Sequence, residues 1–191
     1  MSSIIYVDKV DPQSGTALEI GTSGDTITVP SGATFNVAGT LQSGGAAVGN
    51  TPMFHAYMSG NQSISNSSNT KIAFDSERID TDSAFDTSNY RFTVPSGAAG
   101  KYVFTYWGKM GLDDGKILQL IMYKNGSELS AEETRANFYS SGSGQQINAI
   151  GSFMDTAAVS DYYEVYVFQN NGGSVNLLQE TAGFMGFKLI G

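Results

Sequence analysis

Residues 90–106 read YRFTVPSGAAGKYVFTY, and this stretch decides the fold class. Apolar side chains alternate with polar ones at Phe92 and Val94, and again over residues 102–106. A period of two places alternate side chains on one face of a β-strand. Between the two runs lies Pro95-Ser96-Gly97, a combination that favours a tight turn. The stretch therefore predicts two neighbouring strands, each with one buried face.

The same alternation of apolar and polar residues extends in both directions, from Met53 to the end of the chain. Turn-forming clusters such as Asp113-Asp114-Gly115 and Asn125-Gly126 separate the apolar runs. Short strands at this spacing are typical of a β-sandwich, barrel or jelly roll. We therefore expect an all-β protein. The expected strands are Phe54–Met58, Lys71–Phe74, Tyr90–Val94, Lys101–Trp107, Ile117–Tyr123, Gln146–Phe153, Tyr162–Phe168 and Phe184–Ile190.

Four segments, taken in order, resemble the C1q family. KIAFD (71–75) is similar to its strand ending in Phe-Asp, and 90–106 to its Phe-x-Val-Pro strand, Gly-bearing turn and Tyr-x-Phe strand. MYKNG (122–126) resembles its strand with an Asn-Gly turn, and FMGFKLI (184–190) its closing Phe-x-Gly-Phe strand. The resemblance covers about residues 53–191. It departs from the family in lacking a collagen-like Gly-X-Y run.

This resemblance implies a C1q/TNF-like jelly roll that forms a homotrimer through aromatic-rich faces near a threefold axis. Aromatic side chains dominate interface cores, and the expected trimer-core residues are Phe54, Tyr102, Phe104, Tyr106, Phe184 and Phe187. Both termini of such a head lie at its base, so three loops are expected at the far end. The candidate binding residues of these apical loops are Asp113, Asp114, Tyr139, Ser141, Gln145, Asn170 and Asn171.

The first 42 residues have a different pattern. Apolar pairs at i and i+2 recur between turn signals such as Ser23-Gly24-Asp25 and Pro30-Ser31-Gly32. Strands this short bury nothing alone, and a repeat of about eight residues indicates a structure that stacks or wraps with other chains. We expect a β-rich stem, intertwined in a trimer, with a Gly/Ser/Thr-rich arm as the alternative. Its core residues would be Leu18, Ile20, Ile27, Val29, Phe35 and Val37.

The expected domain order is a stem or anchor at residues 1–42, a Gly-rich neck at 43–52 and the head at 53–191. Residues 21–40, GTSGDTITVPSGATFNVAGT, resemble repeats of marine phage fibre and other virion structural proteins. A C1q-like head on such a stem, in a chain without cysteine, points to a phage rather than to a secreted animal protein.

The charge balance excludes several classes of partner. Lys and Arg number 10 against 18 Asp and Glu, which gives a net charge of −8. This charge argues against binding to nucleic acid or to an anionic membrane surface. No segment reads as a secretory signal, and none has the roughly 20 apolar residues of a membrane span. We expect a protein made in the host cytoplasm and displayed on the virion surface, without membrane insertion.

The sequence offers little for catalysis. His55 is the only histidine, so a metal site built on histidines is excluded, and no nucleophile elbow is present. An acidic stretch is best explained as solvated loop charge, with glycoside hydrolysis and Ca²⁺ coordination as alternatives. Its residues are Asp75, Glu77, Asp80, Asp82 and Asp86. We expect no catalytic residue, no metal site and no cofactor, with Ca²⁺ as the one alternative.

These observations favour a trimeric phage virion structural protein that is not an enzyme. As a short fibre, it would attach to capsid or tail proteins by its stem and present its head to a host-surface glycan or protein. The alternative is a capsid decoration or cement protein that stabilises the capsid at threefold or quasi-threefold positions. A polysaccharide depolymerase is a distant third reading.

Overall fold

The computed structural model describes residues 20–39, 41–43, 46–47, 49–130 and 134–190, and the single positions 10, 15 and 18. The chain divides into two units, Met1–Leu41 and Gln42–Gly191. Residues 1–9 of the expected stem, and Gly44 and Gly45 of the expected neck, lie outside the described residues. Within the described ranges, no helix has the length and apolar character needed to cross a bilayer.

The described part of the first unit contains two tight turns, Thr22–Asp25 and Pro30–Ala33. In each turn the amide of the fourth residue donates to the carbonyl of the first over 3.0 Å. The third residue is Gly24 in one turn and Gly32 in the other, with φ of 95° and 84°. A type II turn requires a positive φ at this position, which glycine adopts without strain. The turns start eight residues apart, which is the expected repeat.

The side chains expected in the stem core are uncovered in the single chain. Their exposed fractions run from 37% at Val37 to 68% at Phe35. Residues 20–39 contain no strand, so the expected short strands do not form within one chain. Apolar side chains that their own chain leaves exposed in a series are available for contact with another chain.

Among its described residues, the second unit consists of β-strands, one turn of 3₁₀-helix, η1 (Gln179–Thr181), and a helical position at Thr134. It begins with a two-residue antiparallel pair, β1 (Gln42–Ser43) and β2 (Ala46–Ala47). The strands of the head are β3 (Met53–Tyr57), β4 (Gln62–Ile64), β5 (Thr70–Lys71), β6 (Ser76–Asp80), β7 (Phe85–Asp86), β8 (Arg91–Thr93), β9 (Gly100–Leu112), β10 (Ile117–Lys124), β11 (Ser127–Glu128), β12 (Ala136–Tyr139), β13 (Gln145–Ala157), β14 (Tyr162–Gln169), β15 (Val175–Leu177) and β16 (Gly183–Lys188).

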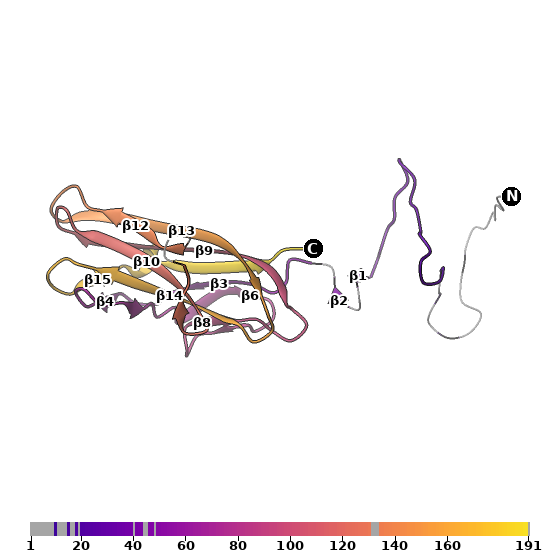
Figure 1. The fold of residues 1–191 in the computed structure, drawn as a ribbon, viewed down its shortest axis with the longest axis horizontal. Helices are drawn as coiled ribbons and strands as arrows, with labels where there is room; N and C mark the ends of the chain where they lie inside the picture. The colour runs from indigo at the N-terminus through magenta and orange to yellow at the C-terminus, as the bar shows by residue number, and fades with distance from the viewer. Residues whose placement is uncertain are drawn as a thin grey trace. The chain divides into compact units, whose positions relative to one another are not determined.

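The strands form two main antiparallel sheets (Figure 1). The five-stranded sheet has the order β13-β9-β16-β3-β6. The other sheet has the order β11-β10-β14-β8-β7, with β12 added to β10 and β5 added to β14, and β15 pairs with β4 separately. The first and last long strands of the head, β3 and β16, therefore lie side by side. This crossover arrangement is a jelly roll, and the all-β prediction is confirmed.

Each of the eight expected strands has a counterpart. The strand expected at 71–74 is reduced to β5, whereas β9 and β13 each extend to 13 residues. The strands that the sequence pattern missed, such as β6, β7 and β12, have only two to five residues. Strands of that length offer too few positions for an alternation to be recognised.

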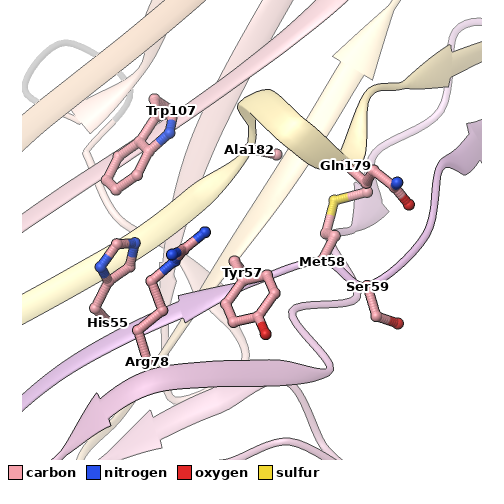
Figure 2. Close-up of a pocket in the computed structure, with 8 residues that line it drawn as sticks. All are labelled: His55, Tyr57, Met58, Ser59, Arg78, Trp107, Gln179 and Ala182. Atoms are coloured by element: carbon pink, nitrogen blue, oxygen red, sulfur yellow. The ribbon is translucent and has the colours of Figure 1, made fainter.

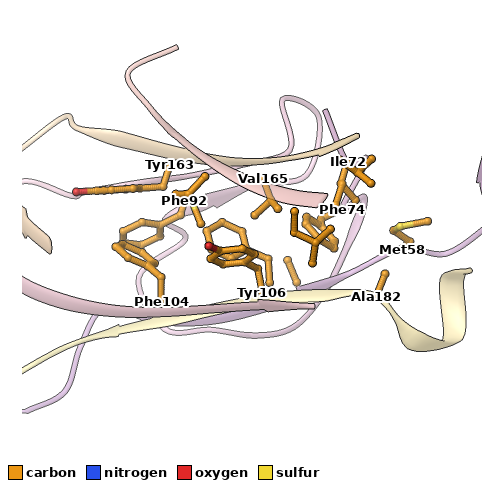
Figure 3. Close-up of a cluster of buried hydrophobic side chains, with 14 of the residues drawn as sticks. Met58, Ile72, Phe74, Phe92, Phe104, Tyr106, Tyr163, Val165 and Ala182 are labelled. Carbon is orange, nitrogen blue, oxygen red and sulfur yellow. The ribbon is translucent and has the colours of Figure 1, made fainter. Parts of the chain in front are cut away.

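Aromatic rings fill the space between the sheets (Figure 3). Phe104 of β9 lies at the centre of this cluster, with ring centroids 4.4 Å from Tyr163, 5.3 Å from Phe153 and 5.9 Å from Phe92. Phe104, Tyr163 and Phe92 are fully buried. Rings that pack in tilted and stacked arrangements stabilise a core beyond the area they bury. The alternation in 90–106 therefore corresponds to real inward-facing positions.

A polar network fixes one end of the sandwich. The Lys124 ammonium lies 2.9 Å from the carboxylate of Asp155 and 3.0 Å from that of Asp161. The Tyr163 hydroxyl donates to Asp155 over 2.7 Å, and the Asn125 amide donates to Asp161 over 2.8 Å. The hydrogen bond from Asn125 is the largest cause that lowers the pKa of Asp161 to about 2. Burial raises the pKa of Asp155, but the hydrogen bonds from Tyr163 and Lys124 lower it by more. Both carboxylates are therefore ionised at neutral pH.

Candidate functional site

Three loops meet at the end of the head opposite its C-terminus (Figure 1). The amide of Asp113 donates to the side-chain oxygen of Asn171 over 2.7 Å. The amide of Ile117 donates to the side-chain oxygen of Asn170 over 2.8 Å. The structure thus brings together the apical residues that the sequence analysis singled out, from segments more than fifty positions apart in the chain.

Most of the apical side chains hold the loops in place. The side-chain oxygens of Asn170 and Asn171 accept hydrogen bonds from backbone amides, as described above. The side-chain oxygen of Gln145 accepts hydrogen bonds from the amide and the hydroxyl of Ser141 over 3.0 and 3.1 Å. Among the hydrogen bonds of the described residues, none uses the side chains of Asp114 or Tyr139. Tyr139 is 71% exposed. These two side chains are the apical ones left to contact a ligand.

One face of the five-stranded sheet points away from the core and carries three cross-strand rows of side chains. Residues directly opposite in an antiparallel pair share a face of the sheet. The first row, which is entirely apolar, contains Met53, Phe187, Val103 and Met154. The second contains Ile79, His55, Met185, Thr105 and Ser152, and the third Tyr57, Gly183, Trp107 and Ile150.

The first row of this outward face is apolar throughout, whereas His55, Thr105 and Ser152 interrupt the second row. Met154 is 71% exposed and Ile150 is 59% exposed, and both lie on the edge strand β13. Ile79, on the opposite edge strand β6, is 47% exposed. A group of exposed apolar side chains on one face marks an interaction site.

The residues expected in the trimer core lie elsewhere. Phe54, Tyr102, Phe104, Tyr106 and Phe184 are at most 3% exposed. The second sheet of the same chain covers them, so they form the protomer's own core and cannot touch a neighbouring protomer. Only Phe187 of that set lies on the outward face, and it does so in the first row. Contact between protomers would therefore use the alternate residues of the same strands.

A hollow of about 390 Å³ opens on the outward face, beside η1 (Figure 2). Its walls come from β3, β6, β9 and the segment around η1, which lie far apart in sequence. The lining residues are His55, Tyr57, Met58, Ser59, Arg78, Trp107, Gln179 and Ala182. None of them belongs to the binding residues expected from the sequence, which lie in the apical loops.

The hollow has one positive charge and aromatic walls. The Arg78 guanidinium lies 4.8 Å from the ring centroid of Tyr57, and the rings of His55 and Trp107 are 5.5 Å apart. Burial lowers the pKa of His55, and the charge of Arg78 lowers it further. The imidazole is therefore neutral at pH 7 and can both donate and accept a hydrogen bond.

Carboxylates of the acidic stretch at 75–86 accept hydrogen bonds from the protein itself. Asp75 accepts the amide and hydroxyl of Ser59 over 2.7 and 2.6 Å. Asp80 accepts backbone amides four and five residues later over 3.0 and 2.9 Å, and Asp86 accepts two amides two and three residues later over 2.9 Å. Within the described residues, no three His, Cys, Asp or Glu side chains gather as metal ligands would. Asp80 and Asp86 therefore close turns, and Asp75 ties the chain before β6 to the segment after β3, so all three have a structural use.

Comparisons with solved structures identify the same fold in other proteins. The globular domain of zebrafish complement 1qA protein is 18% identical, with a TM-score of 0.51 over 73% of this chain and 98% of that one. Murine APRIL is 11% identical, with a TM-score of 0.52 over 72% and 98% of the chains. The Eiger TNF of S. frugiperda is 12% identical, with a TM-score of 0.50 over 72% and 90%. No family model and no curated protein matches the chain. At these identities the likeness shows the C1q/TNF-like jelly-roll fold alone.

Proposed function

We propose, from the C1q/TNF-like jelly roll and its uncovered sheet face, that this chain is a homotrimeric recognition protein of a virus particle and is not an enzyme. In this proposal it is a short phage fibre: the stem joins capsid or tail proteins, and the head presents a recognition surface to the host. The single observation that carries the trimer is the outward face of the five-stranded sheet, which has an apolar row ending at Met154 and leaves Ile79, Ile150 and Met154 exposed in one chain.

The stem supports the same association. Its apolar pairs, such as Ile27 with Val29 and Phe35 with Val37, are exposed in one chain, and they recur at the spacing of the two turns. Three copies around one axis would bury both the sheet faces and these pairs, which a single chain leaves in water. Association in threes also multiplies weak contacts of each head into avidity for a surface that carries many receptors.

The placement on a phage particle rests on the resemblance of residues 21–40 to repeats of phage fibre proteins and on the absence of cysteine. A chain without disulfides gains stability from packing and from subunit association instead.

The trimer is tested by sedimentation equilibrium of the full chain. We expect a species of three times the chain mass of 20.3 kDa. Met154→Asp and Ile150→Asp should dissociate it, because each places a carboxylate in a contact that is desolvated in the trimer. Val159→Asp is the matched control: Val159 is 44% exposed but lies in the turn after β13, outside the sheet face. A wild-type protein that stays monomeric at high concentration would refute the proposal.

The placement is tested by immunogold labelling of intact particles. Gold at a tail or at fibre positions agrees with the fibre. Gold spread over the capsid, together with capsids that burst more easily on heating when the protein is missing, would replace the fibre with the cement alternative. Absence of the protein from purified particles would contradict both.

A further inference from the structure

The only histidine of the chain lies on the sheet face that the proposed trimer buries. His55 is in the second row of the outward face, directly opposite Met185 of β16 on one side and Ile79 of β6 on the other. Its ring centroid is 5.5 Å from that of Trp107 (Figure 2). Histidine is the side chain whose charge changes most readily around neutral pH. A titrating group therefore lies where one copy of the chain would meet the next.

The approach of Trp107 to this histidine depends on a glycine. Gly183 lies between Trp107 and Tyr57 in the third row. A methyl group built on Gly183 would be 2.3 Å from Cζ2 of the indole, so no other residue fits there. The indole thus extends over β16 toward β3 and presents apolar surface to the imidazole of His55.

On β6 the charge that acts on His55 is positive. Arg78 is the extra residue of the bulge at this point of the β3–β6 pair, and its guanidinium repels an imidazolium at His55. The two carboxylates of this strand belong to Glu77 and Asp80. Both pair with the core-facing residues on either side of His55, not with His55 itself.

The other described elements around His55 bring no counter-charge. Asp75 is bonded to Ser59, across the hollow from His55 (Figure 2). No carboxylate is among the described side chains that line the hollow. The remaining neighbours on β3, β16 and β9 are uncharged: Tyr57, Met185, Thr105 and Trp107.

We infer that the homotrimer is acid-labile, because protonation of His55 in each subunit drives the three subunits apart. The inference rests on the proposed trimer and adds a control on its assembly. In the single chain an imidazolium keeps water in the open hollow, whereas contact with a second copy removes that water. A charge without a partner in a desolvated contact, beside the like charge of Arg78, is costly. The trimer therefore keeps its three imidazoles neutral.

The direction of the pH dependence follows from proton linkage. Burial lowers the pKa of His55 in the single chain, and the charge of Arg78 lowers it further. Desolvation in the trimer lowers this pKa again, so separated chains bind more protons than the trimer does. Association is therefore strongest above the pKa of the single chain and weakens as the pH falls through it. With three histidines in each trimer, the association constant falls by up to about a thousandfold per pH unit.

The test is sedimentation equilibrium of the full chain at a series of pH values from 7.5 to 5.0, at constant ionic strength. The association constant of the wild-type trimer should fall by at least about tenfold over this range. His55→Gln keeps a hydrogen-bonding side chain but takes up no proton, so its association constant should stay the same. The carboxylate of Asp161, with a pKa of about 2, remains ionised throughout the range.

The matched control is Val159→His in the His55→Gln background. It restores one histidine per chain at an exposed position outside the sheet face, and its association should not depend on pH. A second measurement needs no change at His55. Because this histidine is the only one, its imidazole protons can be followed by NMR, and its pKa should be lower in the wild-type trimer than in the Met154→Asp monomer.

Two sedimentation results would overturn the inference. One is an association constant of the wild type that does not change between pH 7.5 and pH 5.0. The other is an equal fall in the wild type and in His55→Gln, because the acid would then act through other groups. Both leave the trimer at pH 7.5, and with it the proposed function, intact. A wild-type chain that is monomeric at pH 7.5 refutes the proposed function itself, so the two failures are distinguishable.

Discussion

Replacement of Gly186 by alanine tests how tightly the rings of the two neighbouring strands, β3 and β9, pack over β16. Gly186 pairs with Phe54 on one side and with Phe104 on the other. A methyl group built there would lie 2.6 Å from Cδ1 of Phe104 and 2.8 Å from Cε1 of Phe54. Ordinary contacts of a Cβ atom begin near 3.4 Å, so at least one ring would have to move. Neither ring has room, because both are buried and Phe54 stacks on Phe92 at 4.6 Å.

The expected magnitude follows from two opposing effects. Forcing an extra carbon into a packed core costs about 1–3 kcal/mol. Replacing glycine in a strand recovers about 0.5–1 kcal/mol, because alanine loses less backbone entropy on folding. The free energy of unfolding should therefore fall by about 1–2 kcal/mol. For a chain of this length the melting temperature would drop by roughly 2–8 °C.

The assay is urea unfolding followed by far-ultraviolet circular dichroism, with wild type and variants at one protein concentration. Gly173→Ala is the control: a methyl group there meets no atom within 4 Å, and the residue has no positive φ. That variant should match the wild type or be slightly more stable. If Gly186→Ala is as stable as Gly173→Ala, the rings do not close over β16 as described, and the packing argument fails.

Three further predictions concern other parts of the molecule. Acidification from pH 5 to pH 2 should destabilise the head, because hydrogen bonds in the folded state lower the pKa of Asp161 from the ordinary 3.8 to about 2. The stabilisation by Asp161 is therefore present above pH 3.8 and is lost as the pH falls toward 2. Asp161→Asn should flatten this dependence in urea unfolding at a series of pH values. Asn171→Ala should cost about 1 kcal/mol and speed hydrogen exchange of the Asp113 amide, which donates to Asn171, whereas unchanged exchange would mean that the apical loops are held by other contacts. Replacing Ile27 and Phe35 together by serine should raise the dissociation constant of the trimer measured by sedimentation, without lowering the urea midpoint of the head, and an unchanged constant would favour the arm over an intertwined stem.

The sequence carried enough information for the architecture of the head. The alternation of apolar and polar residues predicted the long strands, and the Pro-Ser-Gly, Asp-Asp-Gly and Asn-Gly clusters predicted the turns between them. Both signals can be recognised in the sequence because they depend only on neighbouring residues. That Asp113 and Asn171 lie at the same end of the head was expected from the order and direction of the strands, not from the residues around each of them. The use of Asn170 and Asn171 as acceptors for backbone amides was not foreseen, since the partner of a side chain depends on which loops meet.

The choice of the contact face could not be made from the sequence. In β9 both series are apolar over much of the strand: Tyr102, Phe104 and Tyr106 on one face, Val103 and Trp107 on the other. A period of two shows that the series face opposite ways but does not show which faces inward. The larger rings were assigned to the interface, and they fill the protomer core instead. The available signal was Ile150 and Met154 of β13, because they lie on the face opposite to the apolar Ile147 and Phe153 of the same strand.

Strand β9 presents different side chains on its two faces, so substitutions on one face need not affect the other. Its even-numbered residues from Tyr102 to Leu112 face the core, and its odd-numbered residues lie on the outward face of the sheet. Substitutions at Val103, Thr105 or Trp107 can therefore alter which subunits assemble with one another, or which molecule is held at the surface, without disturbing the core. After gene duplication, or by design, substitutions at every second position of this one strand could produce two variants of the subunit that each assemble only with copies of themselves.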